Sequence, residues 1–174
     1  MSIKYTGQLS GAQDPVLITV PIKNSAAIIV GQAVSWSAGV TPATATSAIL
    51  GVCTGLVDSK GIQLANTGDA LDGTFNASTN TYTAASNNMT VLGVSAQVVI
   101  DKSAIWLIDA DGSGVFSNLD LFGGFYLATP FNVITDATPN AVKGQFKMVR
   151  LNELNNTSAY FVINESVLDG SAQI

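Results

Sequence analysis

The sequence contains no histidine, and Cys53 is its single cysteine. Without imidazole, the chain can form neither a Ser-His-Asp or Cys-His catalytic group nor a zinc site built on histidine. One cysteine cannot form an intrachain disulfide, so oxidative cross-linking does not stabilise the fold. Because Cys53 follows the apolar run Ile49–Val52, we interpret it as a small buried hydrophobic residue rather than as a nucleophile.

Charged residues are scarce, at 11% of the chain, and the net charge is -5. A disordered chain needs many charges and a nucleic-acid-binding chain needs many basic ones, so both classes are excluded. The only loose basic group consists of Lys143, Lys147 and Arg150. We interpret it as a solvated strand edge that discourages edge pairing, rather than as a phosphate-binding site.

Long apolar runs are also lacking. The longest, such as residues 26–30, are far short of the roughly 20 residues that cross a bilayer. Residues 1–8 have neither the basic start nor the apolar stretch of a secretory signal. We therefore expect a soluble protein that is made in a cytoplasm and has no membrane partner.

The abundant residues favour β structure. Apolar residues make up 47% of the chain, and Ser, Thr, Asn, Asp and Gly, which are typical of strand faces and turns, replace the Glu and Lys of helix surfaces. Short apolar or alternating segments recur between turn residues, at 16–20, 26–36, 49–57, 91–100, 104–108, 125–127, 146–151 and 160–164. This spacing predicts an all-β fold, a compact β-barrel or β-sandwich of short strands with long polar loops and little or no helix.

The length of 174 residues fits one domain or two small ones. Residues 1–15 are polar and Gly-rich, and we expect an N-terminal arm there that is either ordered or flexible; residues 16–174 are expected to form a single β-rich domain. Phe75 and Tyr82 flank a Ser-Thr-Asn turn, which predicts a polar hairpin projecting from the body. Residues 119–122 have the pattern of a single helical turn.

Residues 109–120 have a spacing close to that of an EF-hand calcium loop. Positions 1, 3, 5, 6 and 12 of that motif are occupied by Asp109, Asp111, Ser113, Gly114 and Asp120. However, the last position of the motif normally carries a bidentate Glu, the flanks look like strands, and Asp-Gly and Ser-Gly also signal turns. We expect a connection between strands that needs no metal.

Carboxylate pairs are few. Asp69 and Asp72 flank two apolar residues in a loop, and Asp58 and Asp101 close two similar strands. A glycosidase needs two carboxyl groups about 5–10 Å apart in a cleft lined by aromatic side chains. No glycine pattern matches a phosphate-binding loop. We therefore predict that the chain is not an enzyme, and we assign no catalytic, cofactor-binding or metal-binding residue.

The large aromatic side chains lie on apolar segments. They are Trp36, Trp106, Phe125 and Tyr126. Core packing explains them more simply than a binding surface does. Alternation places Trp106 on the opposite face from Ile105 and Leu107.

The order of segments resembles that of a known family. A polar start leads into Ala26–Val34, a Thr/Ala loop and Ile49–Gly55, and the chain later closes on Ala159–Glu165. This is similar to the small capsid-decoration, or head-cement, proteins of tailed bacteriophages, which often show a strand ending in Gly-x-Ala-Val, a variable loop and an apolar strand containing Gly-Val. The resemblance is best over residues 24–57 and weaker over residues 91–127.

The resemblance implies a structural virion protein that binds the outer surface of an assembled head and bridges capsomers, often as a trimer. Its partner would be the major capsid protein, and it would be made in the host cytoplasm. The low charge agrees, because protein contacts are depleted in charge at their centre. Because exposed chain ends can become ordered on binding, we also expect residues 1–14 to be part of the contact and to be removable without loss of the fold.

Other functions stay open. One is a carbohydrate-binding β-module of a phage fibre or surface protein, which would have to expose Trp36, Trp106 or Tyr126 to solvent. Another is a hydrolase domain that uses Asp residues, and a third is a different structural subunit of the particle, such as part of a tail tube. A cement protein can bury all three aromatic side chains, so their exposure is the cheapest test between the first two functions.

Overall fold

The computed structural model describes residues 3–9, 14–69, 73–91, 93–111, 114–127, 133–134 and 144–164. These residues form fourteen strands and one 3-10 turn, η1 (Asn118–Asp120), and none of them lies in an α-helix. The predicted all-β class is confirmed. The strands form three open sheets in layers, which agrees with a sandwich rather than with a closed barrel.

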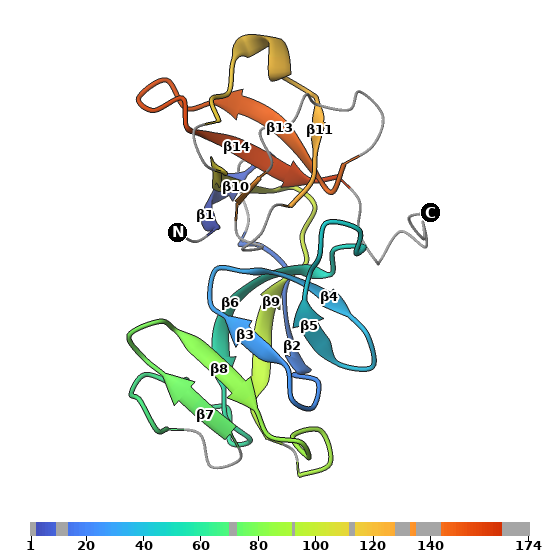
Figure 1. Ribbon diagram of the computed structural model, residues 1–174, viewed down its shortest axis with the longest axis vertical. Helices are drawn as coiled ribbons and strands as arrows, with labels where there is room; N and C mark the ends of the chain where they lie inside the picture. The colour runs from blue at the N-terminus through green and yellow to red at the C-terminus, as the bar shows by residue number, and fades with distance from the viewer. Residues whose placement is uncertain are drawn as a thin grey trace.

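Sheet A lies at one end of the long axis, sheet C lies toward the other end, and sheet B lies between them (Figure 1). In spatial order, sheet A contains β1 (Lys4–Gln8), β10 (Ala104–Ala110), β14 (Ser158–Ile163), β13 (Phe146–Leu151) and β11 (Gly124–Phe125), and β12 (Val133–Ile134) pairs in parallel with β10. Sheet B contains β2 (Leu17–Pro21), β9 (Ser95–Val99), β6 (Gly51–Val57), β4 (Ala33–Trp36) and β5 (Val40–Pro42). Sheet C contains β3 (Ala27–Ile29), β8 (Thr81–Ala84) and β7 (Gly73–Asn76).

Two hydrophobic clusters hold the sheets together, and sheet B contributes to both. Val52 and Val99 join the first cluster with the buried side chains of sheet A. Cys53 and Val98, their neighbours in the chain, join the second cluster with those of sheet C. Successive side chains of a strand point to opposite faces, so both faces of sheet B are covered.

Strand β10 alternates as predicted. Ala104, Trp106 and Ile108 are buried, whereas Ile105 and Leu107 are partly exposed. Trp106 therefore belongs to the first cluster, on the face opposite to its two neighbours.

The expected N-terminal arm is part of sheet A over its described residues. Residues 4–8 form β1, which pairs antiparallel with β10. Ile3 is buried, and the ring of Tyr5 meets Trp106 edge to face with centroids 5.6 Å apart. Removing this segment would uncover the core, so the expectation that residues 1–14 can be deleted without loss of the fold is wrong. Residues 1–2 and 10–13 lie outside the described residues.

The predicted hairpin is present as β7 and β8, with Phe75 paired to Tyr82. Both side chains are buried in the second cluster, so the hairpin packs against the body instead of projecting from it. Asn80 makes its turn with a positive φ of 50°, a conformation that asparagine tolerates better than most residues.

The outer strands of sheet B both end in a proline. At the two ends of the β2–β9 pair, the N–H of Ile100 donates to the carbonyl of Val16 and the N–H of Ile22 donates to the carbonyl of Val94. The backbone groups of every second residue of β2 therefore face β9, and the backbone nitrogen of Pro21, which lies between these positions, faces away from it. In β5 the N–H of Ala43 donates to Ala33, and Pro42 faces away from β4 in the same way. Each edge thus has a residue without an N–H where an outward donor would stand.

Candidate functional site

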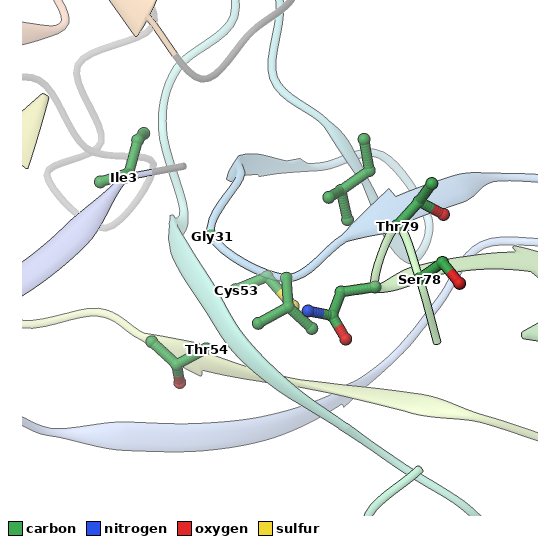
Figure 2. A pocket seen from close by; sticks show the side chains of 9 residues that line it. Ile3, Gly31, Cys53, Thr54, Ser78 and Thr79 are labelled. Atoms are coloured by element: carbon green, nitrogen blue, oxygen red, sulfur yellow. The ribbon is translucent and has the colours of Figure 1, made fainter. Parts of the chain in front are cut away.

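Cys53 lies in a pocket of about 340 Å³ between the start of β1, the β3–β4 turn, β6 and the β7–β8 turn (Figure 2). The thiol is buried and donates to the carbonyl of Gly55 at 3.4 Å. Burial raises the pKa of Cys53 to about 12, so the thiol stays protonated at neutral pH and is a poor nucleophile. The interpretation of Cys53 as a buried hydrophobic residue is confirmed. The other described lining residues include no charged group.

A second pocket, of about 400 Å³, lies beside the β2 edge and is lined by residues that include Asp58 and Met89. Its one carboxylate is engaged locally, because Asp58 Oδ1 accepts hydrogen bonds from the N–H groups of Lys60 and Ile62, each at 2.8 Å. We find no chemical centre in the described part of this pocket.

Asp69 and Asp101 also stabilise turns. Asp69 accepts from the N–H groups of Ala65 and Asn66, and these bonds lower the pKa of its carboxyl. The pKa of Asp101 is lowered by the hydroxyl and N–H of Ser103, which both donate to it. Asp72, the expected neighbour of Asp69, lies outside the described residues. Carboxylates used in this way are turn residues rather than a catalytic pair.

The calcium-like segment connects β10 to β11 in its described residues, as predicted. Asp109 lies within β10 opposite Ser158. Asp120 belongs to η1, where its Oδ2 accepts from the N–H and hydroxyl of Ser117 at 2.7 and 2.9 Å. Residues 112–113 lie outside the described residues. Within the described part of the chain, no three His, Cys, Asp or Glu side chains are placed to hold a metal ion.

The four aromatic side chains differ in their exposure to solvent. Trp106 and Phe125 are buried as predicted, and Tyr126 is partly buried. Trp36 is 45% exposed, so its assignment to the core is wrong. It ends β4 at the turn to β5, whereas Val34 on the same strand and Val40, its partner in β5, are both buried in the second cluster.

The basic group lies on a central strand. Lys147 of β13 pairs with β14 on one side and with Gly124 of β11 on the other, so the interpretation as a strand edge is wrong for Lys147. Arg150, in the same strand, is exposed and lies beyond the two residues of β11. Arg150 places its guanidinium 4.0 Å from the ring centre of Tyr160, which is a cation–π contact. Lys143 lies outside the described residues.

Exposed apolar side chains gather in the segment between β10 and β11, which we call the apical loop (residues 114–123). Val115, Leu119 and Phe122 are 59%, 94% and 65% exposed. In Figure 1 this segment, with η1, forms one end of the long axis. Phe116 anchors it, because its buried ring packs edge to face on Phe125 and Phe161.

Hydrogen bonds fix the shape of the apical loop. Ser117 and Asp120 form a capping box around η1. The N–H of Phe122 donates to Met148 at 2.9 Å, and that of Phe116 donates to Asn156 at 2.7 Å. The second bond joins the loop to the β13–β14 turn, where Leu154 is 97% exposed.

The backbone of Phe122 has a φ of 64°. A bulky residue in this left-handed region is a conformational outlier, and such strain persists only where the surroundings hold it. Sequence reasoning missed this site, although the apolar residues of 119–122 stand between turn residues and outside any strand pattern.

No protein-family model, no curated protein and no solved structure matches the chain significantly. No helical segment in the part of the chain that the structure describes has the length and apolar character needed to cross a membrane.

Proposed function

We propose that the chain is a structural virion protein that binds the outer surface of an assembled phage capsid and stabilises it by bridging capsomers. The observation that carries this proposal is the apical loop, where a low-charge β fold holds apolar side chains in solvent. A contiguous exposed apolar patch marks an interaction surface, and we propose that these side chains form one. The resemblance to head-cement proteins over residues 24–57 supports the same function.

The proposed partner is the major capsid protein in its assembled lattice. Each copy would bury apolar surface against neighbouring capsomers, at about 25 cal/mol per Å² of apolar area. Association of the chain with itself, as a trimer on a local threefold axis, would add avidity to modest individual contacts. The proposal involves no catalysis, no cofactor and no nucleic-acid or membrane partner, and it places synthesis in the host cytoplasm.

The test uses heads assembled from the major capsid protein encoded in the same genome. Purified chain is sedimented with undecorated heads and, separately, mixed with free capsid subunits and examined by size exclusion. We expect sedimentation with heads and little binding to free subunits, because a site shared between capsomers exists only in the lattice. No sedimentation at micromolar concentration would contradict the proposal.

Trp36 supports a second candidate, a carbohydrate-binding module of a fibre or surface protein. Its exposed ring could stack on a sugar, whereas Trp106 is buried and cannot. A glycan array, followed by tryptophan fluorescence titration of the wild type and of Trp36→Ala, tests this function. Sugar binding that disappears in Trp36→Ala would favour it over capsid decoration.

A further inference from the structure

We infer that the apical loop and the adjoining β13–β14 turn are the surface that seats the chain on the capsid, against an apolar and uncharged patch of the shell. This inference rests on the proposed function and names its contact. It replaces the N-terminal segment as the expected contact, because residues 4–8 are paired in sheet A.

The loop is built outward from a buried anchor. Phe116 fixes it to the core, and the capping box between Ser117 and Asp120 fixes its turn. Leu119 and Phe122 then point large apolar side chains into solvent. A contact surface whose shape exists before binding loses little conformational freedom when the partner arrives.

The backbone of Phe122 gives a second and independent reason to regard the apical loop as a binding surface. At its φ of 64° a glycine would be less strained, and glycines follow at 123 and 124. Core packing does not explain a phenylalanine here, because the side chain is 65% exposed. Strain of this kind clusters where a side chain serves binding.

Charge favours a protein partner over a lipid one. Residues 114–127 contain no lysine or arginine, and their single charged residue, Asp120, is hydrogen-bonded inside the turn. The adjoining turn adds a second acid, Glu153, beside Leu154. Loops that bind anionic membranes carry clusters of basic residues beside their apolar ones, which is the opposite arrangement.

The position of the apical loop also gives the orientation of the chain on the shell. Since the apical loop forms one end of the long axis (Figure 1), a chain seated on it stands upright on the shell. Sheet C then points away from the shell into solvent.

Three single variants test the inference by sedimentation with undecorated heads. Phe122→Gly removes the ring and relieves the backbone, and Leu119→Asn replaces the exposed apolar side chain in the middle of η1 with a polar one. Ile62→Asn is the matched control, because Ile62 is 62% exposed but lies in the β6–β7 connection, away from sheet A. We expect the first two to weaken binding about tenfold or more, the control to bind like the wild type, and all three to keep the wild-type melting temperature or, for Phe122→Gly, to exceed it.

The outcomes separate the two proposals. If the wild type sediments with heads and Phe122→Gly and Leu119→Asn do so equally well, the seating surface is wrong and the proposed function stands. If the wild type does not sediment, both are overturned. Flotation of the wild type with vesicles of phosphatidylcholine and phosphatidylglycerol, abolished by Phe122→Gly, would overturn the inference in favour of a membrane. Self-association in analytical ultracentrifugation that Phe122→Gly abolishes would overturn it in favour of a second copy.

Discussion

The buried side chain of Gln145 donates a hydrogen bond from Nε2 to the main-chain carbonyl of Ser47, 98 residues earlier in the chain. The same nitrogen donates to the carbonyl of Thr44 at 2.7 Å, and Oε1 accepts from the N–H of Leu127 at 3.0 Å. One amide thus connects the start of β13 in sheet A to the loop that follows β5 in sheet B.

We predict that Gln145→Leu lowers the free energy of unfolding by about 3 kcal/mol, because it leaves the buried N–H of Leu127 without its acceptor and removes both hydrogen bonds to the loop after β5. Urea denaturation followed by circular dichroism measures the change. Gln63→Leu is the control, since Gln63 is exposed, and it should shift the free energy by less than about 0.5 kcal/mol. Equal effects of the two variants would contradict the role of Gln145.

Trp106 combines complete burial with an indole N–H that has no hydrogen-bond partner among the described residues. Trp106→Ala should cost about 3–5 kcal/mol by leaving a large cavity. Trp106→Phe should lower the free energy of unfolding clearly less. It keeps an aromatic ring in the core, and it removes an indole N–H that is buried without a hydrogen-bond partner in the described part of the chain. Thermal and urea unfolding measure both, and Trp36→Ala, at an exposed site, should change stability little. A phenylalanine variant as unstable as the alanine variant would reveal a partner for the indole N–H.

Acid should destabilise the fold partly through Asp101. Ser103 donates to this carboxylate from its hydroxyl and N–H, which holds the pKa of Asp101 below its usual 3.8. A carboxyl with a lower pKa in the folded state contributes stability that is present above its unfolded pKa and is lost as the pH falls through its folded pKa. The melting temperature should therefore fall below about pH 4, and less steeply in Asp101→Asn. Parallel acid profiles of the two proteins would show that Asp101 contributes nothing.

The connection over residues 109–120 should not depend on calcium. Asp109 lies in β10, and the carboxylate of Asp120 already accepts hydrogen bonds from Ser117. Thermal melts in excess calcium and in chelator should coincide. A calcium-dependent rise in melting temperature would show binding to the folded state, and Asp111→Asn would then test the site.

Binding to heads should respond weakly to salt. The apical loop presents apolar side chains, and its one carboxylate is held within the turn. Salt chiefly screens exposed charge pairs, with a Debye length of about 8 Å at physiological ionic strength. Sedimentation with heads at low and moderate salt should give similar occupancy. A steep loss with added salt would indicate an ion-paired contact at some other surface.

The sequence predicted well those features that depend on local patterns. Alternation in β10 placed Trp106 on the buried face, the turn residues placed the β7–β8 hairpin, and the apolar surroundings of Cys53 predicted its burial. Each of these follows from neighbours within a few positions. Features that depend on distant partners were not predictable in the same way.

β1 becomes a strand because β10, about a hundred residues later, supplies its partner. Trp36 is exposed although Val34 on its own strand and Val40 opposite it are buried, a difference that the pattern of β4 alone does not show. Gln145 belongs to a residue type that is mostly exposed, and only the carbonyl groups of a distant loop explain its burial. The left-handed backbone of Phe122 leaves no sign in the sequence, which is why the apical loop was found from the structure.

The prolines that end the outer strands of sheet B have a consequence for crowded conditions. Fibril growth begins when the bare edge of one sheet captures the edge of another, and every such capture needs outward N–H donors. Pro21 and Pro42 withhold a donor at both borders of the same sheet. Each proline therefore makes its own edge of sheet B a poorer template for strand addition, so copies held close together on a shell are less prone to merge through this sheet.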